Sequence, residues 1–96
     1  MQMRHGDVFV QTVDAIPDGC KPLNHRILAE GEVTGHAHRL DVGELMQAQD
    51  GRVFLKLDTE GKLSHEEHGV IHLPPGTYEV RRQKEYSPEA IRNVAD

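Results

Sequence analysis

The chain has 96 residues, which is enough for one domain but leaves no room for a second independent core. Apolar residues make up 36% of it and aromatic residues 4%, so the core must be small and built mostly from valine, leucine and isoleucine. The formal net charge of −5 argues against non-specific nucleic-acid binding, which depends on cationic contacts to phosphate. We therefore expect one domain over residues 1–96, and a bound metal ion or a dimer partner would help to stabilise it.

The chain carries one cysteine, Cys20, which cannot form an internal disulfide and to which we assign no role. The first ten residues hold no apolar segment of signal-peptide length, and no apolar run approaches the roughly 20 residues that span a bilayer. We therefore expect a cytoplasmic protein without membrane contact.

The predicted elements are mostly short β-strands, identified by β-branched residues, partial alternation and flanking turn signals. In chain order they cover residues 7–13, 25–29, 36–40, 44–49, 52–57, 62–65, 70–73 and 77–83. Asp50-Gly51 lies between two of these strands and is a strong hairpin signal. Residues 16–19 and 74–76 are further turns.

The C-terminal residues follow a different pattern. Ser87-Pro88-Glu89 is typical of a helix start, with serine as the N-cap and proline at the first helical position, and it predicts a short helix over residues 87–95. Many short strands in so short a chain indicate an all-β fold. We predict a small single-domain barrel or sandwich that ends in this helix.

Two short histidine clusters are the main functional signal. His36 and His38 are two residues apart, so in a strand both rings lie on the same face and can converge on one point. His65 and His68 are three residues apart, so they share a face only if the segment bends or forms a helical turn. Histidine is the commonest metal ligand, and the two clusters together predict a composite site.

The other three histidines carry weaker signals. His72 alternates with apolar Ile71 and Leu73, which predicts a partly buried structural side chain. His5 and His25 are isolated in the sequence, and we assign them no role.

Carboxylates near these clusters extend the possible chemistry. Three or four nitrogen and oxygen ligands with an open position are typical of catalytic divalent metal sites. The carboxylates that flank or follow the histidine segments are Glu32, Glu44, Glu66, Glu67 and Glu79. Glu66 and Glu67 lie between His65 and His68 and are the candidate catalytic residues. Without a metal ion, the same groups could carry out general acid–base catalysis.

The stretch from Gly31 to Glu79 resembles the cupin pattern. The first cupin motif is matched by His36-Ala37-His38, followed by Glu44 and, after six intervening residues, Gly51. The second motif is matched by Gly69 and the Pro74-Pro75-Gly76 turn, with Glu79 where the family has a histidine.

The cupin resemblance implies a divalent metal ion held by His36, His38, Glu44 and Glu79, and it leaves His65 and His68 unexplained. The competing prediction is a distinct small β-barrel whose site is formed by His36, His38, His65 and His68. The identity of the ion stays open among zinc, iron, manganese and nickel.

We expect a metal-binding domain that acts on a small molecule, for example as a metal-dependent hydrolase. One alternative is a metal-independent ribonuclease, with a histidine or glutamate as base and acid and with Arg81, Arg82 or Lys84 holding phosphate, although the net charge does not favour nucleic acid. Another is a non-catalytic module that binds a protein partner in a larger assembly, and a homodimer is also open.

Overall fold

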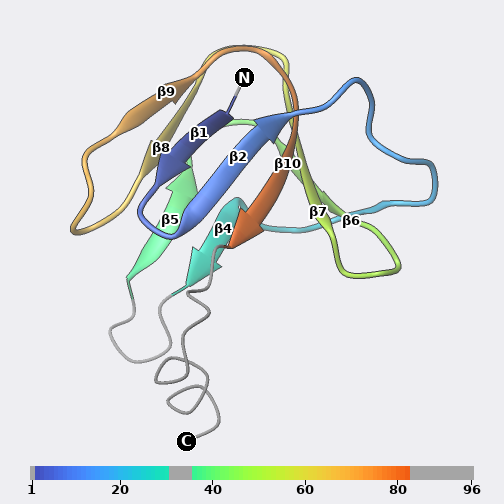
Figure 1. The fold of residues 1–96 in the computed structure, drawn as a ribbon, viewed down its shortest axis with the longest axis horizontal. Helices are drawn as coiled ribbons and strands as arrows, with labels where there is room; N and C mark the ends of the chain where they lie inside the picture. The colour runs from blue at the N-terminus through green and yellow to red at the C-terminus, as the bar shows by residue number, and fades with distance from the viewer. Residues whose placement is uncertain (1, 31–35, 83–96) are drawn as a thin grey trace, which may run out of the picture.

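The computed structural model describes residues 2–30 and 36–82, and these form two antiparallel sheets. The six-stranded sheet has the spatial order β1 (Gln2–His5), β2 (Val8–Thr12), β10 (Gly76–Arg82), β7 (Val53–Leu57), β6 (Glu44–Gln47) and β3 (Lys21–Pro22). The four-stranded sheet has the order β4 (Ile27–Glu30), β5 (Ala37–Leu40), β8 (Gly61–Ser64) and β9 (Ile71–Leu73). Figure 1 shows this arrangement.

The all-β prediction is confirmed for residues 2–30 and 36–82, whose strands do not close into a barrel. The strands of the described residues hydrogen-bond into two separate sheets instead of one continuous ladder, so the architecture is the sandwich-like alternative. The predicted helix over residues 87–95 lies outside the described residues. In the described part of the chain, no helix is long and apolar enough to cross a membrane.

The core consists of inward-facing side chains from both sheets. The six-stranded sheet contributes Val8, Val10, Leu45, Leu55, Leu57, Tyr78 and Val80. The four-stranded sheet contributes Leu40, Leu63 and Leu73. Successive residues of a strand face opposite sides of a sheet, so Val8 and Val10 of β2 face the same side and are both buried. Each such side chain contributes about 1.5–3 kcal/mol on burial, and the contact between these side chains holds the two sheets together.

Two hairpins frame the six-stranded sheet. The predicted hairpin at Asp50-Gly51 is confirmed, because β6 and β7 pair antiparallel around it and Gly51 has a φ of 94°. The hairpin of β1 and β2 was not predicted. Its two-residue turn is Gly6-Asp7, and Gly6 has a φ of 63°, as the first central residue of a type II′ turn requires.

The register of the four-stranded sheet positions the histidines. β5 and β8 pair antiparallel with Arg39 opposite Ser64 and Leu40 opposite Leu63. Continued by one residue, this register brings His38 opposite His65, and the centroids of their rings are 4.4 Å apart. In Figure 1 the start of β5, the loop between β8 and β9, and the β1–β2 turn lie close together at one end of the molecule.

Candidate metal-binding site

Five histidine rings gather at this end of the molecule. The ring of His65 lies centrally, with centroid distances of 4.4 Å to His38, 4.5 Å to His68 and 5.5 Å to His36. His5 lies beside His38 at a centroid distance of 4.9 Å. We call these five residues the histidine cluster. The two histidine clusters of the sequence therefore meet in space.

Both sheets contribute to the histidine cluster. His5 is the last residue of β1 in the six-stranded sheet, and His38 lies in β5 of the four-stranded sheet. His65 and His68 lie in the loop after β8, where residues 66–68 form a bend. Because the segment bends, the rings of His65 and His68 lie side by side although the two residues are three apart in the sequence.

The cluster contains two groups of side chains that could hold a metal ion. In the first, one ligand atom from each of His38, His65 and His68 lies within 4.8 Å of the other two. In the second, the same holds for His36, His65 and Glu66. Because both groups use His65, they overlap, and we take them as one composite site with alternative ligands.

His38 is the innermost member of the first group. Its side chain is almost fully buried, with 3% exposure. Its Nδ1 is 2.8 Å from Nδ1 of His5, so Nε2 is the nitrogen left for a metal ion. That Nε2 lies 3.2 Å from Oδ1 of Asp7, which follows Gly6 in the β1–β2 turn.

His65 and His68 complete the first group from the loop. The Nδ1 of His65 accepts a hydrogen bond of 3.0 Å from the backbone N–H of Glu67, which places the proton of a neutral ring on Nε2. If a metal ion binds to His65, this hydrogen bond is therefore lost, for example because the ring rotates.

The ring of His68 lies against the backbone of Gly6. A Cβ at Gly6 would be 2.5 Å from Nε2 of His68, and the φ of Gly6 is in the left-handed region. A glycine is therefore required here both by the turn and by the approach of the ring.

Burial keeps the inner histidines uncharged. Together with the neighbouring His65 and His5, and against the effect of Asp7, it lowers the pKa of His38 to about 4. Burial also lowers the pKa of His5, although the hydrogen bond to Gly69 acts in the opposite direction. Only the neutral imidazole has a lone pair for a metal ion, so both shifts favour metal binding at neutral pH.

The two predicted catalytic carboxylates have different environments. Glu66 accepts hydrogen bonds from the side chain of Arg39 and from the backbone N–H of Ala37, and these lower its pKa to about 2. Such a carboxylate accepts a proton poorly. Glu67 is 69% exposed, and its Oε1 lies 3.8 Å from Nδ1 of His36. A catalytic role for either residue stays a prediction.

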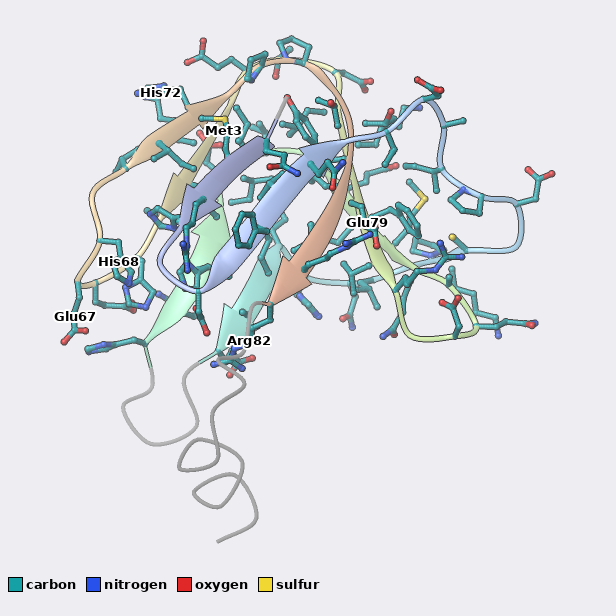
Figure 2. The ribbon with its side chains drawn as sticks, in the orientation of Figure 1. Met3, Glu67, His68, His72, Glu79 and Arg82 are labelled. Atoms are coloured by element: carbon teal, nitrogen blue, oxygen red, sulfur yellow. The ribbon has the colours of Figure 1, made fainter. Side chains whose placement is uncertain are left out.

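Glu44 and Glu79 lie outside both groups. Glu44 is exposed on β6 opposite Lys56, and Glu79 lies on β10 with its carboxylate bonded to the guanidinium of Arg81. Both strands belong to the six-stranded sheet, and Figure 2 shows Glu79 well away from His68. Among the described residues, His65 and His68 take the place beside His36 and His38 that the cupin resemblance gave to these glutamates.

A family model described as "Domain of unknown function (DUF8820)" matches residues 4–83. The chain belongs to this family. The matched span includes all five residues of the histidine cluster. No curated protein and no solved structure matches the chain.

Sequence reasoning missed His5, which the structure places in the histidine cluster beside His38. The signal was present, because Gly6-Asp7 between two short runs is a two-residue hairpin pattern that would have predicted β1. The prediction of a partly buried His72 is wrong: its side chain is exposed and lies 2.6 Å from Oε1 of Glu60. His25 is also exposed, and its Nδ1 accepts a hydrogen bond from the backbone N–H of Ile27.

Proposed function

We propose that this domain binds one divalent transition-metal ion through His38, His65 and His68. The observation that carries the proposal is the convergence of three imidazoles from two separate segments, with ligand atoms within 4.8 Å of one another. Imidazole suits zinc, copper, nickel and iron better than it suits magnesium or calcium. Zinc is the first choice, because three histidines with a fourth open position are a familiar catalytic zinc arrangement.

We further propose that the bound ion serves hydrolysis of a small-molecule substrate. Exposure increases across the group from the buried His38 through His65 to the exposed His68, so one side of the site faces solvent. Three protein ligands leave a position for water, and zinc lowers the pKa of such a water to about 7. Glu67, exposed beside His36, is the carboxylate best placed to accept a proton at the open side.

Metal binding is tested directly on protein purified without a histidine tag. Titration with zinc, followed by calorimetry and by elemental analysis after dialysis, should give one ion per chain in the wild-type protein. His68→Gln should lose most of this binding, because it removes one of three ligands. His72→Gln is the matched control, since His72 is an exposed histidine outside the site and should bind as the wild type does. A wild-type protein that retains no divalent ion contradicts the proposal.

Hydrolysis is tested with the same proteins on carboxylic-ester and phosphodiester substrates. The zinc-loaded wild-type protein should show turnover that EDTA abolishes and added zinc restores. If His68→Gln turns over substrate as fast as the wild type, the reaction takes place outside the proposed metal site. Cleavage of RNA that persists in EDTA would support the metal-independent acid–base alternative instead.

A further inference from the structure

The contacts on either side of His38 form one continuous array. His5 Nε2 lies 2.6 Å from the carbonyl oxygen of Gly69, and His5 Nδ1 lies 2.8 Å from His38 Nδ1. His38 Nε2 in turn lies 3.2 Å from Asp7 Oδ1. The other oxygen of this carboxylate, Asp7 Oδ2, accepts a hydrogen bond of 2.7 Å from Arg82 Nε. The array thus runs from a backbone carbonyl through two imidazoles to a carboxylate.

This array is one proton short when both imidazoles are neutral. A carbonyl oxygen and an ionised carboxylate only accept hydrogen bonds, so both ends of the array are acceptors. Three contacts need three N–H donors, whereas two neutral imidazoles carry one N–H each.

In the arrangement that keeps the two shortest contacts, the nitrogen that lacks a proton is Nε2 of His38. His5 must donate from Nε2 to Gly69, because the carbonyl cannot donate. His5 Nδ1 is then an acceptor, and His38 must donate to it from Nδ1. The lone pair of His38 Nε2 is left facing Oδ1 of Asp7, and these two acceptors repel each other unless a cation lies between them, a position that Arg82, bonded to Oδ2, does not occupy.

We propose that the cation at this position is the metal ion, that Asp7 is its carboxylate partner, and that His5 is a positioning residue which fixes His38 in the tautomer that binds metal. This inference rests on the proposed metal-binding function and adds two residues to it: Asp7 becomes a fourth protein ligand, so the water of the proposed hydrolysis would bind as a fifth ligand. Two ligand atoms with bonds of about 2.0–2.1 Å at a tetrahedral angle are about 3.3 Å apart. The contact between Asp7 and His38 has this separation, at 3.2 Å.

Positioning through a second histidine has a known physical effect. A metal-binding histidine donates its other ring N–H to a neighbouring acceptor, which fixes the ring and makes the ligating nitrogen more basic. Here the acceptor is His5, which is 3% exposed and is itself held by Gly69. A proton in place of the ion would also complete the array, as an imidazolium shared by His5 and His38.

The variant Asp7→Asn distinguishes these two occupants. The amide oxygen can still accept from Arg82, while the amide N–H₂ can donate to His38 Nε2, so the array is complete without any cation. We expect the metal-free variant to melt at a higher temperature than the metal-free wild type at pH 7, and to bind zinc at least 10-fold more weakly. The partly exposed ion pair of Asp7 with Arg82 is lost in either case and contributes little. If an imidazolium occupies the array, the same change also removes the ion pair with the buried His38 and lowers the melting temperature. That result overturns the inference.

The variant His5→Phe tests the positioning role. It retains a ring of similar shape but removes both nitrogens, and loss of such a partner lowers metal affinity by about 10–100-fold. His72→Phe is the control and should bind zinc as the wild type does. If the wild type binds zinc and both Asp7→Asn and His5→Phe bind it with the same affinity, this inference is wrong, whereas the proposed function still holds. If the wild type binds no zinc, both this inference and the proposed function are wrong.

Nitrogen-15 NMR of the wild-type imidazoles gives a readout that does not depend on variant folding. In the zinc-loaded protein we expect His38 to be protonated at Nδ1 and bound to metal through Nε2, and His5 to be protonated at Nε2 alone. A coupling across the hydrogen bond between the two Nδ1 atoms should accompany this state. Zinc bound through Nδ1 of His38, or a doubly protonated His5, overturns the proposed tautomers.

Discussion

Acidification of the metal-free protein is the perturbation whose outcome the structure determines most directly. In the native state burial holds the pKa of His38 at about 4, whereas an unfolded histidine has a pKa of about 6.5. The unfolded state therefore binds more protons between these values. Linkage requires that the free energy of unfolding is fully retained above pH 6.5 and falls as the pH drops from 6.5 towards 4.

The size of the loss follows from the difference in pKa. A difference of about 2.5 units, at 1.36 kcal/mol per unit, gives an upper limit of about 3 kcal/mol for His38 alone. The lowered pKa of His5 acts in the same direction. Since small domains are stable by about 5–15 kcal/mol, this loss is a large fraction of the total.

Carboxylates do not contribute to the change in the free energy of unfolding if the measurement is confined to pH 5–7. The pKa of Asp7 is lowered chiefly by Arg82, against the effect of burial, and that of Glu66 is lowered to about 2, chiefly by Arg39. Stability that depends on a carboxylate with a lowered pKa is retained above the unfolded value of about 4 and is lost only below it. The change between pH 7 and pH 5 therefore reports the histidines.

Urea unfolding in EDTA, followed by far-ultraviolet circular dichroism at several pH values, measures this loss. With an m-value of about 1–3 kcal/mol/M, we expect the midpoint to decrease by about 0.5–2 M between pH 7 and pH 5. His38→Gln should flatten this dependence, whereas His72→Gln should retain it. A midpoint that is constant, or that rises on acidification, would refute the reasoning, because it would mean that His38 is already protonated in the folded protein.

Three further predictions concern single features of the site. Gly6→Ala should destabilise the protein by more than Gly19→Ala, because both glycines have positive φ but only at Gly6 does a Cβ meet another side chain; urea unfolding of the two variants compares them. Zinc at 100 times its dissociation constant should stabilise the native state by about 2.7 kcal/mol, which thermal melts with and without EDTA will show. Glu44→Gln should leave zinc affinity unchanged in calorimetry, and a loss of binding would restore Glu44 to the ligand set.

Much of the fold could be predicted from local sequence signals. Alternation identified β2 and β10, and Asp50-Gly51 identified the β6–β7 hairpin, because these patterns depend only on strand geometry and turn conformation. The division into two sheets was not predictable in this way. The turn at Pro74-Pro75-Gly76 illustrates why: it joins β9 of one sheet to β10 of the other, and no local pattern records such a change of partner.

The candidate site was predictable only in part. The i, i+2 spacing placed His36 and His38 near one point, and the structure brings both to His65. Whether His65 and His68 would join them depended on a bend in the loop and on the β5–β8 register, which are tertiary features. The cupin resemblance pointed to Glu44 and Glu79 instead, and as a resemblance it stays a prediction.

The histidine cluster lies where the two sheets meet, and this position links metal binding to stability. The six-stranded sheet contributes His5 and Asp7 through the β1–β2 hairpin, and the four-stranded sheet contributes His38. On the inference above, the metal-free state leaves His38 Nε2 without a proton against the carboxylate of Asp7, and a buried polar group without its partner costs about 1–3 kcal/mol. An ion at His38 Nε2 would remove this cost and cross-link the sheets through side chains. Stability measured without metal therefore understates that of the metal-bound protein, and a variant that weakens metal binding should also lower stability whenever zinc is present.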